Sequence, residues 1–257
     1  MKLCQRPHAS CGACCGLYNR KDSGRTAVRA ELARHTRVVA RAERTPEGFA
    51  AAVRRLSAGA PTALFPSIRV CQLVGFLDAR ETRVGCLAHP KATGGIDLRA
   101  CGAYDVETCE SFLCPSHTGI AEHEAAIVEA ATDFHLYGLV VTDGPFVRAV
   151  LDGLAAAAGG AIDPGQLREP TVADALRRLF GLKETLEPGS DGLFGAFRQG
   201  GPGASAAGDP GTGPEAILAA LGADDRSGND ADMLEVEVCA RFVACEAALR
   251  AQRPRSK

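Results

Sequence analysis

Apolar residues recur at helical spacing along most of the chain. The stretch from residue 26 to 59, TAVRAELARHTRVVARAERTPEGFAAAVRRLSAG, predicts two helices with a break at Pro46. The same spacing in GIAEHEAAIVEAATDFHLYG, PFVRAVLDGLAAAAGG and TVADALRRLFGL predicts further helices, the last with Thr171 as its N-cap. DADMLEVEVCARFVACEAALRAQ predicts a long amphipathic helix.

One short region has the character of strands instead. SIRVCQLVGFLD and ETRVGCLAHP predict a strand pair with a turn around Ala79 to Glu81, and a loop-rich stretch follows them. Tryptophan is absent and aromatic residues make up only 5%, so the core is built largely from Ala, Leu and Val, which favours helices. We therefore expect a mainly α protein. Its irregular Cys-rich metal-binding N-terminal domain, with the short strand pair, packs against a helical C-terminal part.

Composition divides the chain into four regions. The first is a Cys-rich metal-binding domain over residues 1–118, and a helical region follows over 119–197. Residues 198–214 are rich in Gly and Pro and almost free of large apolar side chains, which predicts a flexible linker. Residues 215–257 form the last region, the C-terminal helices.

The formal net charge of -2 is unevenly distributed. Residues 1–55 carry twelve Lys and Arg against four Asp and Glu. A basic face can meet nucleic acid, but arginines at this spacing fit the solvated side of a helix, and they would also offset the negative charge of a thiolate metal site. The acidic remainder of the chain and a pI of about 6.3 argue against nucleic acid as a partner. The arginines concerned are Arg29, Arg34, Arg37, Arg41 and Arg44.

The sequence contains no secretory signal and no membrane-spanning stretch. Residues 1–16 lack an apolar run, and no segment approaches about 18 uncharged apolar residues. We therefore expect a cytoplasmic protein that does not associate with membranes. Disulfides rarely persist in that compartment, so eleven cysteines indicate metal or redox chemistry.

Nine of the eleven cysteines precede residue 115, and SCGACCGLYN places three of them within five positions. Cys11 and Cys14 have the Cys-x-x-Cys spacing that supplies two ligands to a zinc or iron–sulfur site. Cys14 and Cys15 are adjacent and generally point in different directions, so they serve two neighbouring sites, or one ligates while the other packs. The candidate metal ligands are Cys11, Cys14, Cys15, Cys71, Cys86, Cys101, Cys109 and Cys114, with Cys4 as a weaker candidate.

Histidines add fewer candidate ligands. His8, His89 and His117 follow Cys4, Cys86 and Cys114 closely and could substitute as ligands, whereas His35 is expected at the surface. His123 and His135 are expected to be structural or exposed. Cys239 and Cys245 point about 120° apart on a helix, which predicts core packing.

The cysteine motifs carry a resemblance to a known family. CGACC, followed by CQLVGFL and CGAYDVETCESFLC, resembles the zinc- or iron-chelating cysteine-cluster proteins. That family pairs a Cys-x-x-Cys-Cys motif with a later Cys-x-x-Tyr…Cys-x-x-Phe motif, which here falls on Cys101, Tyr104, Cys109 and Phe112. The resemblance covers about residues 4–117 and implies metal chelation. The Arg-Pro usually found between the Tyr and the next Cys is absent and that gap is shorter, which leaves the metal and the ligand set open.

Three functions remain open at this stage. The preferred hypothesis is a cytoplasmic metal-binding protein that holds zinc or an iron–sulfur cluster and presents its helical part to a protein partner. Flagellin lysine methylases are similar in their cysteine pattern, so the alternative is an enzyme that performs redox or methyl-transfer chemistry on a protein substrate. A zinc-stabilised nucleic-acid-binding module is the second alternative. Catalytic residues are not identified, because the chain lacks GxxxxGK[ST], HExxH and GxSxG motifs.

Overall fold

A computed structural model describes residues 3–186, 211–223, 226 and 228–252. The chain divides into two compact units. Unit 1 comprises Met1–His117 and Asp133–Gly138, and unit 2 comprises Thr118–Thr132 and Leu139–Lys257. Most of the described residues lie in helices, and the sheet has two strands, so the expected mainly α fold is confirmed.

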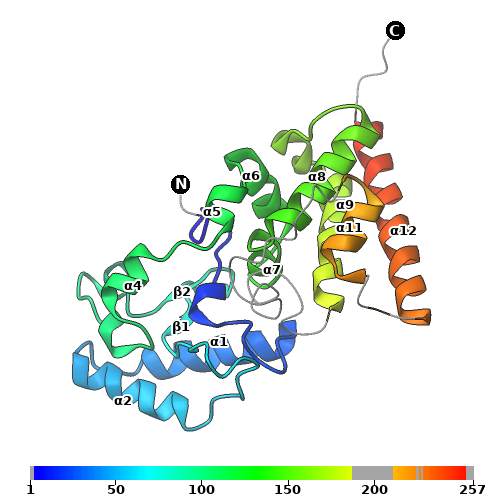
Figure 1. The fold of residues 1–257 in the computed structure, drawn as a ribbon. Helices are drawn as coiled ribbons and strands as arrows, with labels where there is room; N and C mark the ends of the chain where they lie inside the picture. Colours follow the sequence, from blue (N-terminus) through cyan, green and yellow to red (C-terminus); the bar gives the residue numbers. More distant parts are fainter. Residues whose placement is uncertain (1–2, 187–210, 224–225, 227, 253–257) are drawn as a thin grey trace. The chain divides into compact units, whose positions relative to one another are not determined.

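Two helices form one side of unit 1 (Figure 1). They are α1 (Arg25–Val39) and α2 (Pro46–Ser57), which confirms the two helices predicted on either side of the break before Pro46. The Thr45 hydroxyl accepts a hydrogen bond from the Gly48 amide, and Pro46 occupies the first turn, where its missing N–H costs nothing. Helix α2 buries Phe49, Ala52 and Leu56 on one face.

The predicted strand pair is also confirmed. Strands β1 (Val74–Phe76) and β2 (Val84–Cys86) are antiparallel, with Gly75 opposite Gly85 and Val74 opposite Cys86. The connecting turn contains Glu81 at a φ of 56°, and the Asp78 carboxylate accepts hydrogen bonds from the Thr82 and Arg83 amides. These bonds satisfy the turn backbone and hold the two strands in register.

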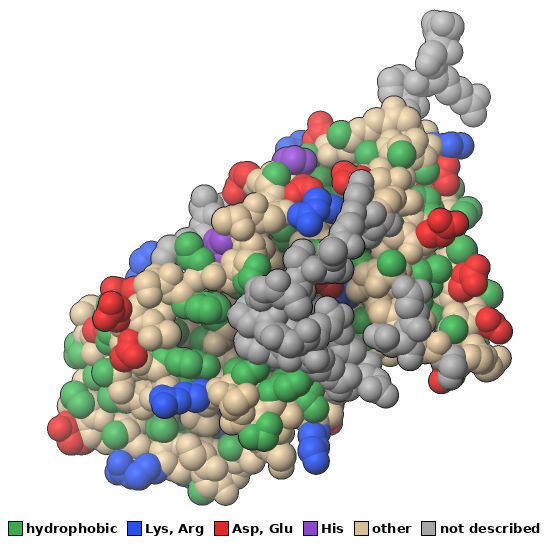
Figure 2. Space-filling model, in the orientation of Figure 1, with side chains coloured by type: hydrophobic (Ala, Val, Ile, Leu, Met, Phe, Trp, Pro, Cys, Tyr) green, Lys and Arg blue, Asp and Glu red, His purple; other side chains and the backbone are tan. Residues whose placement is uncertain are grey.

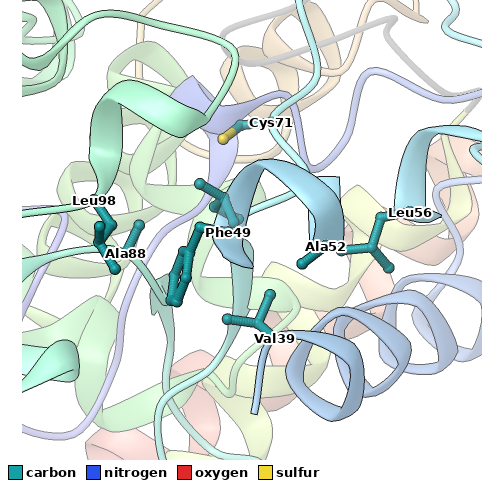
Figure 3. Packing of buried hydrophobic residues seen from close by; sticks show 8 residues of the cluster. Val39, Phe49, Ala52, Leu56, Cys71, Ala88 and Leu98 are labelled. Carbon is teal, nitrogen blue, oxygen red and sulfur yellow. The ribbon is translucent and has the colours of Figure 1, made fainter. Parts of the chain in front are cut away.

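Short helical segments complete unit 1. They are η1 (Ala13–Cys15), α3 (Pro90–Thr93), η2 (Arg99–Cys101), α4 (Val106–Ser111) and α5 (Ser116–Gly119), whose last two residues belong to unit 2. The core packs α2 against the segments that carry cysteines (Figure 3). Its buried members are Val39, Phe49, Ala52, Leu56, Cys71, Leu73, Ala88 and Leu98, and Cys15, Cys86 and Cys101 pack against them.

A buried charged group lies beside this core. The Arg20 guanidinium is 2.6 Å from the Glu31 carboxylate, which in turn is 3.2 Å from Nε2 of His35. Nδ1 of His35 lies 2.8 Å from the Val74 carbonyl oxygen. The expected surface position of His35 is therefore wrong, because the imidazole is buried with Nδ1 hydrogen-bonded to β1 and with Nε2 beside the Glu31 carboxylate.

Unit 2 is helical among its described residues. Helices α8 (Gly144–Ala158) and α9 (Pro170–Phe180) pack with α11 (Pro214–Ala220) and α12 (Asn229–Ala251), and α6 (Glu122–Ala131) packs against α8 and α9. The expected Thr171 N-cap is wrong. Glu169 occupies the N-cap position of α9 without a side-chain capping bond, and the helix begins at Pro170, whose fixed φ suits the first helical position.

The remaining helical segments of unit 2 are shorter. They are η3 (Pro164–Arg168), η4 (Gly181–Thr185) and α7 (Leu136–Val141), which begins in unit 1. Asp143 caps α8 through the Phe146 amide and also pairs with the buried Lys183 ammonium at 2.6 Å. None of the described helices combines the length and apolarity needed to cross a bilayer. The predicted linker at 198–214 lies outside the described residues up to residue 210.

Candidate metal centre

The N-terminal cysteines lie on a tight hairpin that leads into η1. An isolated bridge joins Gln5 and Ser10, and the Cys11 amide donates to the Cys4 carbonyl oxygen at 3.0 Å. The Ala13 amide then donates to Cys11 Sγ at 3.3 Å. A hydrogen bond from a backbone amide to the sulfur favours the thiolate form that a metal ligand requires. The hairpin therefore brings Cys4, Cys11 and the following cysteines into one small region.

A second segment joins Cys4 from more than a hundred residues away. Sγ of Cys4 lies 3.4 Å from Nε2 of His117, and the His117 amide donates to the Cys114 carbonyl oxygen. Burial raises the pKa of Cys11 well above its usual value, and the nearby Cys14, Cys4 and Cys114 charges raise it further. We call Cys4, Cys11, Cys14 and Cys114 the first thiol group, with His117 at its edge.

The other thiols gather around Cys71. The Cys71 amide donates to the Cys15 carbonyl oxygen at 2.9 Å, while Cys15 and Cys86 pack against the core that contains Cys71. Burial raises the pKa of Cys86 to about 11, and the Cys71 and Cys109 charges contribute to the rise. Burial likewise raises the pKa of Cys109, and the charges of Cys71 and Cys14 raise it further. Cys15, Cys71, Cys86 and Cys109 form the second thiol group.

Cys14 and Cys15 join the two groups. A hydrogen bond with the Cys15 thiol lowers the pKa of Cys14 to about 7. The same bond, together with burial, raises the pKa of Cys15 well above its usual value. The charges that raise it further come from Cys14, Cys71 and Cys86. The two alternatives from the sequence, two neighbouring sites or one ligand and one packed thiol, both stay open.

Cys101, which begins the later sequence motif, packs against the core that contains Cys71, as Cys15 and Cys86 do. Its thiol is 3.5 Å from the Pro46 carbonyl oxygen at the start of α2. Burial raises the pKa of Cys101, and the second cause is the Glu47 carboxylate rather than another thiol. Tyr104, the next motif residue, donates from its hydroxyl to the Arg69 carbonyl oxygen at 2.9 Å. Both residues therefore fasten the loop to its surroundings.

Polar contacts hold the segment that carries Cys109. Helix α4 buries none of its residues. The Arg99 guanidinium binds Asp97 and Glu110 at 2.6 and 2.7 Å, and Asp105 caps α4 by accepting from the Thr108 amide. The positive charge of Arg99 also lowers the pKa of Cys86 and Cys109, against the larger effect of burial. Arg99 is thus a basic residue positioned beside the second thiol group.

The other candidate histidines have different roles. Nδ1 of His89 accepts from the Lys91 amide and caps α3, and His8 is exposed. His135 is buried, with Nε2 2.9 Å from the Ser23 carbonyl oxygen, and His123 is exposed. In unit 2, Cys245 is buried and Cys239 is half-buried on α12.

The donor set suits a soft metal, but the thiols do not converge in this arrangement. Within the described part of the chain, no three or more Cys, His, Asp or Glu side chains form a group that could hold a metal ion. Each thiol group nevertheless contains four cysteines, the number and type of donors in tetrahedral zinc and many iron–sulfur sites. Cysteine side chains move between staggered rotamers about a single bond, so convergence of the thiols on a metal would require side-chain rotations together with a shift of α4.

The sequence did not indicate which cysteines are neighbours, because this depends on contacts between distant segments. His117, a candidate ligand from its position near Cys114, lies beside the thiol of Cys4. Comparison of the chain with protein-family models, curated proteins and solved structures found no match. The resemblance to cysteine-cluster proteins therefore stays a prediction.

Proposed function

We propose that unit 1 binds a soft metal, as zinc ions or an iron–sulfur cluster, at two neighbouring centres that meet at the Cys14–Cys15 peptide bond. The first centre uses the first thiol group, with His117 available in place of one thiol. The second centre uses the second thiol group. The observation that carries this proposal is that eight cysteines from distant parts of the chain lie near enough to one another for their charges to raise one another's pKa values.

The surroundings of the thiols support this function. Four thiolates on one divalent zinc leave two negative charges, and the basic residues that dominate positions 1–55 would offset them. Arg99 supplies a further positive charge close to Cys86 and Cys109. Gly102 leaves room for Cys71, because a Cβ at that position would lie 3.0 Å from Cys71 Sγ. Eleven cysteines suit metal chemistry in a reducing compartment, and we therefore also propose a cytoplasmic location.

Metal binding would also stabilise unit 1. The thiols must lose their protons to bind metal, and burial disfavours the charged thiolate form. A bound cation stabilises the thiolates and so offsets this cost of burial. The weakly buried α4 would then be held by Cys109 as well as by Arg99. For a structural site of this kind, the free energy of binding is also free energy of folding.

Metal analysis of anaerobically purified protein tests the proposal. We expect about two zinc ions per chain, or iron with acid-labile sulfide and a broad absorption near ~400 nm. Cys11→Ser and Cys86→Ser should each remove the metal of one centre, because a hydroxyl is a poor ligand for a soft metal. Cys14→Ser should resemble Cys11→Ser, and Cys15→Ser should resemble Cys86→Ser.

Two control variants sharpen the result. Cys239 and Cys245 both belong to unit 2, so Cys239→Ser and Cys245→Ser should keep the full metal content. A chain that is purified without metal, whose reduced thiols bind neither zinc nor iron and whose stability does not change on their addition, would refute the proposal. Loss of all metal in each single variant would instead show one shared centre.

A further inference from the structure

Helix α12 carries a row of apolar side chains that faces solvent. Met233, Val236 and Val243 are 62%, 69% and 59% exposed, and Ala240 and Ala247 are exposed in line with them. We call these five residues the α12 stripe. Figure 2 shows hydrophobic and acidic side chains mixed on the surface over α12, the helix drawn in orange to red in Figure 1. The stripe residues alternate in steps of three and four, the heptad spacing of paired helices.

The stripe is not needed for the fold of unit 2. The opposite face of α12 provides the packing against α8, α9 and α11, and its buried residues are Leu234, Val238, Phe242, Cys245 and Leu249. At 3.6 residues per turn, the centre of the stripe lies about 180° from the centre of this buried face. An apolar row directly opposite a satisfied face indicates a second interaction surface.

The charges along α12 select the kind of partner. The first half, residues 229–240, contains the acidic Asp230, Asp232, Glu235 and Glu237 and no basic residue. The second half, residues 241–251, contains Arg241 and Arg250 against Glu246, and three further basic residues follow in the sequence. Two parallel copies of α12 would place acidic half against acidic half. Antiparallel copies would place each acidic half against a basic one.

The stripe is also nearly symmetric about its centre. Val236 and Val243 lie on either side of Ala240, and Met233 and Ala247 lie one further turn away on either side. Asp232 and Arg250 are separated by about five turns, so both lie on the same flank of the stripe. The side chain of Arg250 contacts the Glu246 carboxylate and donates to the Ala157 carbonyl oxygen, and it is still 61% exposed.

We propose that the α12 stripe binds the α12 stripe of a second copy of this chain, antiparallel, about a two-fold axis near Ala240. Met233 then packs on Ala247 of the second copy, and Val236 packs on Val243 of the second copy. Asp232 faces Arg250 of the second copy, and the symmetry repeats each contact. This interface is independent of the metal centre.

Sedimentation of the full-length chain under reducing conditions tests the proposal. We expect a mass of twice 26.7 kDa for the native protein. The double change Val236→Glu with Val243→Glu should raise the dimer dissociation constant by about tenfold or more, because four carboxylates would enter the apolar seam. Helix content should not change, because both valines are exposed. Ala51→Glu, at an exposed alanine of α2, adds a charge elsewhere and should leave the dimer intact.

Charge exchange tests the orientation. Asp232→Arg should weaken the dimer, and addition of Arg250→Asp in the same chain should restore it, since the two positions face each other only in the antiparallel pair. A monomeric native protein at about 100 μM, far above the dissociation constants of stable dimers, would overturn the proposal. A dimer that survives the double glutamate change would overturn it too. If the stripe instead binds a different protein, the pure chain will be monomeric, which is the result that overturns the proposal.

Discussion

Cys14 and Cys15 occupy adjacent positions with opposite acid–base properties. Their mutual hydrogen bond lowers the pKa of Cys14 to about 7. It raises the pKa of Cys15, and burial raises it further. The difference arises because two neighbouring thiols cannot both be ionised at low cost in a partly buried site. A metal cation bound at each of the two proposed centres would stabilise both thiolates and remove this conflict.

A thiol of unit 2 provides a contrasting case at the same scale. Burial raises the pKa of Cys245 to about 12. Below the pKa of the unfolded thiol, near ~8.5, Cys245 keeps its proton in both states and its contribution to stability is fully present. This contribution is lost as the pH rises through the pKa of the folded state. We therefore expect native Cys245 to resist alkylation by iodoacetamide at pH 9 and to react rapidly once the chain is unfolded in urea.

Mass spectrometry of digested protein measures this difference. Exposed Cys109 of the metal-free protein serves as the reactive reference within the same sample. If native Cys245 reacts at pH 9 as fast as Cys109, the thiol is not buried in the way described.

At the scale of elements, Gly16 sets the distance between the η1 segment and the chain that carries Cys71. It ends η1 with a φ of 81°, in the left-handed region that favours glycine. A Cβ at this position would lie 2.8 Å from the Arg69 carbonyl oxygen and 2.9 Å from Val70 Cα. The close approach permits the hydrogen bond between the Cys71 amide and the Cys15 carbonyl oxygen. Gly16 therefore positions two members of the second thiol group.

Gly16→Ala should destabilise unit 1 by about 2 kcal/mol or more, from left-handed strain and from the clash with backbone. It should also lower the metal content of the second centre. Gly95→Ala is a matched control, because Gly95 has a φ of 106° with nothing within 4 Å of its Cβ position. Urea denaturation of both variants separates the strain, which they share, from the clash. Equal losses would show that the approach of the two segments is unimportant.

At the scale of the whole molecule, the chain returns to unit 1 after it has entered unit 2. The returning segment, Asp133–Gly138, is attached to the N-terminal region by hydrogen bonds from Tyr137 to the Leu3 carbonyl oxygen and from Tyr18 to the His135 carbonyl oxygen. The side chains of Arg25 and Asp133 form an ion pair. Leu3 and Tyr18 flank the first cysteines in the sequence, so metal binding should stabilise the Asp133–Gly138 segment as well.

Hydrogen exchange measures this coupling. Removal of metal with a chelator should accelerate exchange in β1, β2 and the Asp133–Gly138 segment, because all belong to unit 1. Exchange in α8 and α9 should stay nearly unchanged, since those helices lie in unit 2 with their own core. Equal acceleration in α8 would contradict a metal effect confined to unit 1. No acceleration in β1 and β2 would show that metal does not support their fold.

Much of the helical structure could be predicted from the sequence, because its causes are local. The apolar spacing around Pro46 predicts α1 and α2, and the turn between β1 and β2 follows from residues within a few positions of one another. The start of α9 was predicted less accurately: Thr171 was expected as the N-cap, whereas Glu169 occupies that position and the helix begins at Pro170. Several residues there can satisfy the first turn. The density of cysteines before residue 115 was enough to indicate a metal centre as a hypothesis.

The grouping of the thiols required the tertiary structure. Cys101 begins the later motif but lies against Pro46, while Cys71 and Cys86, outside that motif, lie with Cys15. His35 is buried because Arg20 and Glu31 complete a charged group around it. Each of these outcomes depends on contacts between residues far apart in the chain, which spacing along the sequence does not encode. The sequence by itself determined the long helices and the supply of thiols. Only the tertiary structure decided which thiols are neighbours and showed the short helices α3, α4 and α5 in the stretch expected to be loop-rich.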